Sequence, residues 1–457
     1  MSLRQRRLLF ILFIVLFIII VPAVLLYATG QQINWRRFEF EKTSAIIIDS
    51  EPRDAMITLN GAPVSSSFVI PFGKPTLTKA KISSLAPGDY VVGLEKEGFW
   101  PWNEQITLDP GEAANAGTVR LFRKTEPELI SSDARIAQRA EFSPNKRRLL
   151  LFAHDALTAI DIETGKREFS FSVPFNPETD PVRWSPDHEA VIIGTRLLDF
   201  SDGDMVNIGA ATGRAAHQAR WDSRDSNVAY YLDGMKLYRF VVSERSSQLI
   251  SDLSPFIKER SFIDYYIEGA RLYIVAAETA TRQTLLFASL PQTAEGEIAL
   301  PSGRYRFETH EGTGKPRLFE ESKRTIYLIE EPVPLLRRFR ISNAAEEVAA
   351  TTWVGSDLVY STPFELRLWD GGSGRSELLT RIGTPIIAIK PLPIDGYLAY
   401  ATDTGITIFN YRIDPFANPL DIVSTTSLRA LDVGPDGSML YFYGQYNGQA
   451  GLFRVAI

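Results

Sequence analysis

The chain has 457 residues, of which 45% are hydrophobic and 23% are charged, and its formal net charge is -6. This length is too great for one ordinary domain and suits two or three. Because there is no basic excess to neutralise phosphate groups, the composition argues against a nucleic-acid partner. Cysteine is absent, which excludes disulfides, thiolate nucleophiles, zinc–thiolate sites and a lipid-modified cysteine.

The N-terminal segment predicts a transmembrane signal anchor over residues 1–30. From Leu8 to Tyr27 the chain reads LLFILFIVLFIIIVPAVLLY, twenty residues without a charge, and as a helix this run would span about 30 Å of hydrocarbon. Three arginines precede it, which favours a cytoplasmic N-terminus and extracytoplasmic C-terminal domains: Arg4, Arg6 and Arg7. We therefore expect a single-pass membrane protein that contacts the lipid bilayer through Leu8 to Tyr27, with a linker at residues 31–43.

A cleaved signal peptide is the alternative interpretation of this segment. Such peptides have an apolar region of about 7 to 15 residues that ends at a small-x-small site. Ala28 and Gly30 offer a weak site of this kind, but the apolar run before them is longer. The uncleaved anchor is the preferred prediction. The short stub before the span makes a signal-relaying cytoplasmic domain unexpected.

Residues 44–122 alternate between apolar and polar side chains, as half-buried antiparallel strands do. Tyr90, Val92 and Leu94 show this period of two. The strands are separated by dipeptides and tripeptides that supply tight turns, namely Asn60-Gly61, Pro87-Gly88-Asp89, Glu97-Gly98 and Asp109-Pro110-Gly111. The pattern predicts one small all-β module.

Three stretches of this module resemble the PEGA domain family: IIIDSEPRDAMITLNG from Ile46, LAPGDYVVGLEKEGFWPW from Leu85 and LDPGE from Leu108. In that family an S-x-P-x-G-A opening and the turns P-G-x-Y and K-x-G-Y mark successive strands. The sequence departs from the pattern at Asp54, where the family has glycine, so Asp54 is expected to tolerate the turn conformation. The resemblance implies a small β-sandwich that serves as an extracytoplasmic interaction module and has no catalytic role.

The aromatic side chains of GFWPW raise the question of a binding surface. Phe99 occupies the place of the family's aromatic residue and is expected in the core, since so small a module needs its large apolar side chains there. Trp100 and Trp102, on either side of Pro101, are expected to share one strand face. Packing is the preferred interpretation, and an exposed pair that contacts a sugar or a partner chain is the alternative. Trp100 and Trp102 are the candidate ligand-contact residues.

Residues 123–457 contain a repeated strand–turn–strand pattern. The clearest copies are AEFSPNKRRLLLFA from Ala140, VRWSPDHEAVIIG from Val182, ARWDSRDSNVAYYL from Ala219 and LDVGPDGSMLYFYG from Leu431. With weaker copies between them, the mean period is about 42 residues, which is typical of a four-stranded propeller blade. We predict a β-propeller with eight blades, and seven is the alternative.

The last copy ends at GLFRVAI with its third strand. The segment PELISSD from Pro127 resembles the fourth strand of another copy, SQLISDL from Ser247. We predict that it pairs with the C-terminal strand and closes the ring, which removes open sheet edges. The motif Trp184-Ser185-Pro186-Asp187 resembles the W-S-P-D-G of TolB-like and WD-like propellers. This resemblance implies an architecture and no particular reaction.

The sequence shows no catalytic or metal-binding motif. Its four histidines have no second ligand at metal-binding spacing and are expected in turns or on the surface: His154, His188, His217 and His310. Gly371 to Gly374 form a turn and no G-x-S-x-G elbow occurs, so a serine-hydrolase nucleophile is missing. No cofactor and no metal site are predicted.

Clustered acids have simpler explanations than catalysis or calcium binding. The aspartates of DFSDGD fit a hairpin turn better than a calcium loop: Asp199, Asp202 and Asp204. A glycosidase needs two carboxylates on either side of one bond. Neighbours on a strand point to opposite faces, so neither of two pairs can be that site: Glu320-Glu321 and Glu330-Glu331.

The whole pattern predicts an all-β protein with an N-terminal transmembrane helix, a PEGA-like β-sandwich at residues 44–122 and a β-propeller at residues 123–457. Its expected role is non-enzymatic binding or scaffolding at the cell envelope, with an extracytoplasmic protein or glycan as partner. The alternative is a propeller-fold envelope enzyme that acts on a polysaccharide, which would require carboxylates from different blades to converge in the central channel.

Overall fold

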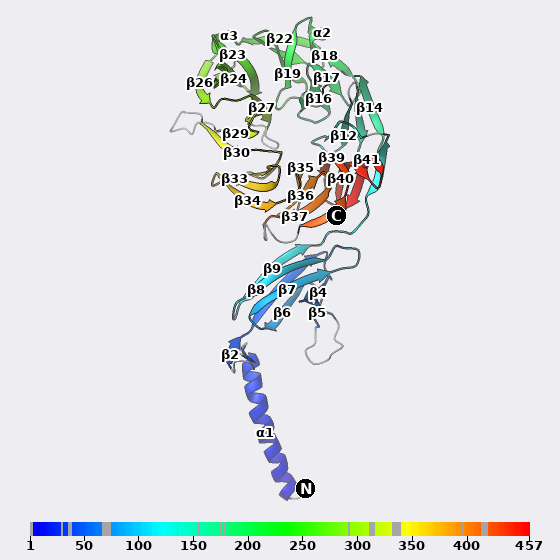
Figure 1. Cartoon of the computed structure of the whole chain (residues 1–457), viewed down its shortest axis with the longest axis vertical. Coiled ribbons are helices and arrows are strands. Elements are labelled where there is room, and N and C mark those ends of the chain that lie inside the picture. The colour runs from blue at the N-terminus through cyan, green and yellow to red at the C-terminus, as the bar shows by residue number, and fades with distance from the viewer. Residues whose placement is uncertain are drawn as a thin grey trace. The chain divides into compact units, whose positions relative to one another are not determined.

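A computed structural model describes residues 3–28, 31–34, 39–65, 75–134, 136–153, 156–172, 176, 180–290, 293–309, 316–330, 340–394, 396–412 and 419–457. The chain divides into two compact units, residues 1–125 together with Ile457, and residues 126–456. Figure 1 shows the course of the chain in each unit.

The first unit begins with helix α1 (Leu3–Ala28), which is followed by the antiparallel pair β1 (Gln31–Asn34) and β2 (Glu39–Lys42). In α1 the apolar side chains from Phe10 to Ile20 are between 43% and 67% exposed. Among the residues that the structure describes, no helix meets the length and apolarity needed to cross a membrane. The transmembrane anchor therefore stays a prediction.

A β-sandwich follows the helix. One sheet has the order β6-β3-β9 and the other the order β5-β4-β7-β8. Their bounds are β3 (Ser44–Glu51), β4 (Met56–Leu59), β5 (Ala62–Pro63), β6 (Ala80–Leu85), β7 (Gly88–Glu95), β8 (Trp102–Leu108) and β9 (Ala113–Arg120). The two sheets share one core, to which the first contributes Ile46 and Val119 and the second Ile57 and Val92. The predicted small sandwich is present.

The turns of the sandwich adopt the backbone that the sequence predicts. Asn60 and Gly61 both have positive φ, 49° and 78°, as a tight hairpin turn between β4 and β5 requires. Asp54, where the family has glycine, has φ of 64°. One feature differs from the antiparallel expectation, because β3 and β9 pair in parallel. These strands lie far apart in sequence, so no short hairpin forces them to be antiparallel.

The second unit is a ring of four-stranded sheets, each an antiparallel meander (Figure 1). The described residues form eight such sheets in this unit, which we call blades 1 to 8. The strands of the first four blades are β11 (Arg139–Phe142), β12 (Arg148–Ala153), β13 (Ala156–Asp161) and β14 (Arg167–Ser172); β15 (Val182–Trp184), β16 (Ala190–Ile193), β17 (Arg196–Asp199) and β18 (Met205–Asn207); β19 (Ala216–Trp221), β20 (Val228–Asp233), β21 (Lys236–Val241) and β22 (Ser246–Asp252); and β23 (Ser261–Glu268), β24 (Arg271–Thr279), β25 (Arg282–Ser289) and β26 (Thr293–Leu300).

The remaining blades repeat this design, so the prediction of eight blades agrees with the described sheets. Two short helices, which the sequence did not predict, connect blade 2 to blade 3 and blade 3 to blade 4: α2 (Ile208–Thr212) and α3 (Ser254–Ile257). The strands of blades 5 to 8 are β27 (Tyr305–Thr309), β28 (Pro316–Glu320), β29 (Thr325–Glu330) and β30 (Arg340–Ala345); β31 (Ala350–Val354), β32 (Asp357–Ser361), β33 (Glu365–Asp370) and β34 (Arg375–Arg381); β35 (Ile386–Pro391), β36 (Tyr397–Thr402), β37 (Gly405–Asn410) and β38 (Leu420–Ser424); and β39 (Ser427–Val433), β40 (Met439–Tyr446) and β41 (Gln449–Ala456) with β10 (Glu128–Asp133).

Strand β10 closes the ring. It pairs antiparallel with β41, the C-terminal strand, and becomes the fourth strand of blade 8. A polar network supports the closure, because the Tyr443 hydroxyl donates to Asp133 at 2.9 Å and accepts the backbone N–H of Ala137 at 3.0 Å. Arg167 of blade 1 pairs with the same carboxylate at 2.6 Å. The predicted pairing of the first and last strands is confirmed.

The Trp-Ser-Pro-Asp motif forms the turn between the first two strands of blade 2, in which Ser185 is buried and Asp187 is exposed. The hydroxyl of Ser185 donates to Asp187 at 2.6 Å and accepts the backbone N–H of Ala190 at 3.0 Å. Ser143 makes the equivalent bond to Asn145 in blade 1, at 2.7 Å. Serine is needed here because a buried hydroxyl can both donate to the acid or amide and accept from the returning strand.

Candidate binding sites

The two predicted contact tryptophans have different environments. Trp102 begins β8 and packs against the sandwich core, together with Phe99. Trp100 precedes the strand, and the Nζ atom of Lys124 lies 4.8 Å from the centre of its ring. The indole Nε1 of Trp100 is buried without a hydrogen-bond partner among the described residues. The core role of Phe99 agrees with its position, and partner contact by Trp100 and Trp102 stays a prediction.

The DFSDGD segment is a hydrogen-bonded turn. Asp199 accepts the backbone N–H and hydroxyl of Ser201 at 2.7 and 2.6 Å. Asp202 accepts the N–H of Asp204 at 2.8 Å, and Asp204 pairs with Arg245. The described part of the chain contains no cluster of three or more metal-ligating side chains.

Glu320 and Glu321, one of the two acid pairs, have different partners. Glu320 is buried and accepts the backbone N–H groups of Arg304, Ser322 and Lys323, whereas Glu321 pairs with Arg306. Burial raises the pKa of Glu320, but these N–H groups lower it more, so the net pKa is below the ordinary value. Glu331 lies outside the described residues.

Two of the four histidines can be placed. His188 lies in the turn between β15 and β16 with φ of 61°, and His217 is exposed on β19. His154 and His310 lie outside the described residues. The two that are described occupy the turn and surface positions that the sequence predicts.

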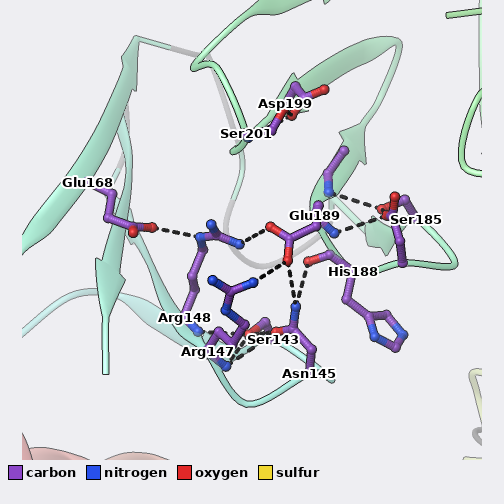
Figure 2. Close-up of polar contacts among 12 residues, drawn as sticks. Ser143, Asn145, Arg147, Arg148, Glu168, Ser185, His188, Glu189, Asp199 and Ser201 are labelled. Carbon is purple, nitrogen blue, oxygen red and sulfur yellow. Dashed lines mark hydrogen bonds and ion pairs between the residues drawn. The ribbon is translucent and has the colours of Figure 1, made fainter. Parts of the chain in front are cut away.

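A dense polar cluster joins blades 1 and 2 (Figure 2). The side chain of Arg148 is 7% exposed and lies between two carboxylates, with Nε 2.7 Å from Glu168 and Nη1 2.5 Å from Glu189. Burial lowers the pKa of Arg148, but the hydrogen bonds that its guanidinium donates to both carboxylates raise the pKa more, so the net value lies above the ordinary one. Because this buried charge is fully paired, the cluster is an interblade clamp and offers no free ligand group.

An open pocket of about 490 Å³ lies beside the closing strands. Among the described residues that line it, Asp133 is the charged one, and its carboxylate is already held by Arg167 and Tyr443. The other lining residues are small or uncharged: Ser132, Ala134, Ile136, Gln445, Gly448, Gln449 and Ala450.

The first strand of each blade lies at the centre of the ring. First strands of neighbouring blades contact each other, for example β15 with β19, β23 with β27 and β35 with β39. At the position equivalent to Glu141, each of these strands carries a charged residue, except in blade 6, where Thr352 stands. We call the following seven the inner-strand charges: Glu141, Arg183, Arg220, Asp264, Arg306, Lys390 and Asp432.

Arg220 and Asp264 form the strongest contact of this set. The Nη2 atom of Arg220 lies 2.7 and 2.6 Å from the two carboxylate oxygens of Asp264, and the side chains are 8% and 9% exposed. Asp264 also accepts the backbone N–H of Phe307 in blade 5, at 2.8 Å. This carboxylate therefore joins three consecutive blades.

Other inner-strand charges are paired as well. The Nζ atom of Lys390 lies 3.5 Å from the carboxylate of Asp432, which also accepts the backbone N–H of Val433. Glu141 pairs with Arg139 at 2.7 Å and accepts the indole N–H of Trp184 at 3.3 Å. Arg306 pairs with Glu308 and Glu321, at 2.7 and 3.3 Å.

Arg183 is the exception. Within the described part of the chain its guanidinium has no hydrogen bond or ion pair, although its backbone carbonyl accepts the Trp221 indole N–H at 2.9 Å. Burial and then the charge of Arg220 lower the pKa of Arg183 to about 9. The side chain is half-buried, so solvent reaches it.

The comparison with protein families identifies the first domain. Residues 43–120 match the model described as "PEGA domain". The chain contains a PEGA domain. This agrees with the sandwich topology of residues 44–120 and with the resemblance found in the sequence. The search of curated proteins gave no match.

Two of the solved structures similar to this chain are described as a WD40 domain and a β-propeller domain. The C-terminal WD40 domain of Sif2 is 14% identical with a TM-score of 0.46, over 72% of this chain and 98% of that one. The β-propeller domain of Cps50 (Swd1) from Myceliophteria thermophila is 13% identical with a TM-score of 0.42, over 61% and 96%. At these values the similarity concerns the fold alone, and the eight sheets of the chain itself establish the propeller.

The inner-strand charges were missed by reasoning from the sequence. A signal was present, because in the clearest copies a charged residue comes directly before the residue that opens the turn, as in Glu141-Phe142, Arg183-Trp184 and Arg220-Trp221. Period-two alternation places such a residue on the opposite strand face from the packed aromatic. Which of these charges meet one another depends on the closed ring.

Proposed function

We propose that this protein is a membrane-anchored, non-enzymatic binding or scaffolding protein of the cell envelope. The anchor is Leu8 to Tyr27, the N-terminus is cytoplasmic, and the PEGA domain and propeller are extracytoplasmic. The propeller displays the interaction surface, and an extracytoplasmic protein is the preferred partner, with a glycan as the alternative.

The main support for membrane anchoring is the exposed apolar run in α1. Eleven consecutive side chains, from Phe10 to Ile20, expose apolar surface around the whole helix. A helix that is apolar all round needs an apolar environment, and a lipid bilayer supplies one. The arginines before the run support a cytoplasmic N-terminus by the positive-inside tendency.

The pairing of the inner-strand carboxylates with cations supports a binding role over catalysis. Each of them is held by a cation from the propeller: Asp264 by Arg220, Asp432 by Lys390 and Glu141 by Arg139. A glycosidase needs one carboxyl group that can carry a proton and a second that stays ionised beside the bond. Carboxylates fixed in ion pairs suit ring stability better than this proton transfer.

Membrane attachment is tested by fractionating cells that express the full chain. We expect it to stay in the membrane pellet after alkaline carbonate extraction, and a variant lacking residues 8–27 to move to the soluble fraction. External protease should digest the propeller in cells whose outer barrier has been opened, while the inner membrane is intact. A propeller protected from that protease would contradict the proposed orientation.

The non-enzymatic role is tested with the detergent-solubilised full chain and isolated envelope polysaccharide. We expect no increase in reducing ends over a long incubation. Release of soluble sugar that disappears in an Asp432→Asn variant would replace the binding role with the polysaccharide-acting alternative.

A further inference from the structure

Arg183 points away from blade 1, toward the following blade. Its neighbours Val182 and Trp184 pack against the core that blades 1 and 2 share. Side chains alternate along a strand, so Arg183 lies on the other face. Its cross-strand partner Ile192 packs into the core between blades 2 and 3. Arg183 thus reaches the inner end of the gap between these blades, beside Arg220.

The charges around Arg183 are mostly positive. Burial has the largest effect on the pKa of Arg183, and the next largest effects come from Arg220, Asp264, Tyr265 and Arg306. Asp264 is the one carboxylate of this group, and its oxygens already accept Arg220 and the N–H groups of Tyr265 and Phe307.

Unsatisfied donors therefore meet at this point. The guanidinium of Arg183 has no partner within the described part of the chain, and the Nε of Arg220 is buried without a hydrogen bond to any described residue. Burying a cation without a counter-charge is costly, so the half-buried Arg183 would gain from a counter-charge. Of these three arginines, Arg220 and Arg306 are paired, and the guanidinium of Arg183 is left free to meet an anion.

We infer that Arg183 is a binding site for a single carboxylate at the centre of the propeller. The planar guanidinium fork matches a carboxylate through two parallel hydrogen bonds. One free guanidinium also balances one carboxylate, whereas a phosphate group carries about two negative charges and would call for a second free cation. Arg220 and Arg306 cannot supply it, since each is already paired.

This site deepens the proposed function, on which it rests for the source of the ligand. The carboxylate comes from an acidic side chain or the chain terminus of the bound protein, or alternatively from a small organic acid. Both have the same chemistry at Arg183. The protein carboxylate has a peptide backbone attached and the small organic acid does not. A peptide probe and a free-acid probe therefore distinguish the two sources.

The test measures binding of two probes to the detergent-solubilised full chain by isothermal titration and thermal shift. One probe is acetate, and the other is the capped peptide acetyl-Gly-Gly-Glu-Gly-Gly-amide, with the Gln peptide as its uncharged control. Three proteins are compared: wild type, Arg183→Gln and Arg375→Gln. Arg375 is an exposed arginine at the start of the outer strand β34, so its variant makes the same charge change away from the ring centre.

We expect the Glu peptide to bind the wild type and the Arg375→Gln variant equally, and Arg183→Gln at least tenfold more weakly. Binding of acetate alone with the same dependence on Arg183 supports the carboxylate site and assigns it to small acids. Equal binding by Arg183→Gln, or no binding of either probe to wild type, overturns the inference. The Arg183→Gln protein should fold, because it loses an unpaired charge, and circular dichroism checks this.

This outcome is separable from that of the proposed function. If the full chain stays membrane-bound and forms a complex with an envelope protein that Arg183→Gln leaves unchanged, the carboxylate site fails and the binding role stands. If the chain is not membrane-bound but the Glu peptide binds through Arg183, the carboxylate site is supported and the proposed membrane location is wrong.

Discussion

The guanidinium of Arg220 and the carboxylate of Asp264 join blades 3 and 4, with Nη2 lying 2.7 and 2.6 Å from the two oxygens. Both side chains are more than nine-tenths buried. The same carboxylate accepts a backbone N–H from blade 5. A single ion pair thus ties three sheets together at the centre of the ring.

Replacing Asp264 with asparagine should destabilise the propeller strongly. The change leaves Arg220 buried without a counter-charge, and such losses cost about 3–5 kcal/mol. The measurement is the free energy of unfolding from urea denaturation. Asp204→Asn is the matched control, since its pair with Arg245 is largely exposed and should contribute less than about 1 kcal/mol. Equal effects of the two substitutions would contradict the central role of the buried pair.

Replacing Arg183 with methionine should stabilise the propeller at neutral pH. The pKa of Arg183 is about 9 in the folded protein, well below the ordinary value that it has in the unfolded chain. Between the folded and the unfolded pKa, the unfolded chain binds more protons than the folded chain. The charge of Arg183 therefore destabilises the folded protein fully below pH 9, and this destabilisation fades as the pH rises above 9. After a discount for solvent in the channel, we expect a gain of about 1–2 kcal/mol at pH 7. A variant that is less stable than wild type at pH 7 would show that Arg183 is already paired.

Replacing Gly451 with alanine should weaken the closure of the ring. A Cβ atom there would collide with the backbone oxygen of Ser131 in β10 and approach the Leu129 side chain to 2.9 Å. Overpacking of this kind costs about 1–3 kcal/mol, and loss of the closing strand exposes sheet edges. We expect a lower unfolding midpoint and aggregates in size-exclusion chromatography. Gly296→Ala is the control, because its Cβ would meet no atom within 4 Å.

Glu320 should contribute to stability above its unfolded pKa. Its net pKa is lowered in the folded protein, so the unfolded chain binds more protons in acid. The contribution is therefore complete above about pH 5 and is lost as pH falls through the folded pKa. Glu320→Gln should lower stability at pH 7 and reduce the slope of unfolding free energy between about pH 5 and 3. An unchanged slope would mean that other carboxyl groups account for the acid sensitivity.

The two tryptophans should respond differently to alanine substitution. Trp102 packs on the sandwich core, so its removal should cost about 2–4 kcal/mol. Trp100 contacts Lys124, and the loss of this cation–π contact should cost about 1 kcal/mol. Denaturation followed by circular dichroism measures both. A partner bound through Trp100 would be released by Trp100→Ala without unfolding, and a larger stability loss for Trp100 than for Trp102 would contradict this assignment.

The sequence by itself determined the domain types and the repeat. Period-two alternation and turn residues such as Asn60-Gly61 are local, so they predicted the sandwich strands directly. The spacing of the Trp184-type motifs predicted the blades, and the missing fourth strand predicted the pairing of β10 with β41. Each of these inferences depends on residues that are neighbours in the chain or on a count of strands.

Only the tertiary structure decided which charges are paired. Arg183, Arg220 and Asp264 stand on successive blades, about 40 residues apart, which is the period of a blade. Nothing local distinguishes the arginine that meets Asp264 from the one that does not. Ring closure brings their strands together at the centre of the propeller. The burial of each side chain at that place determines the free-energy cost of desolvating its charge. The candidate carboxylate site could therefore be recognised only once the blades were in place around one centre.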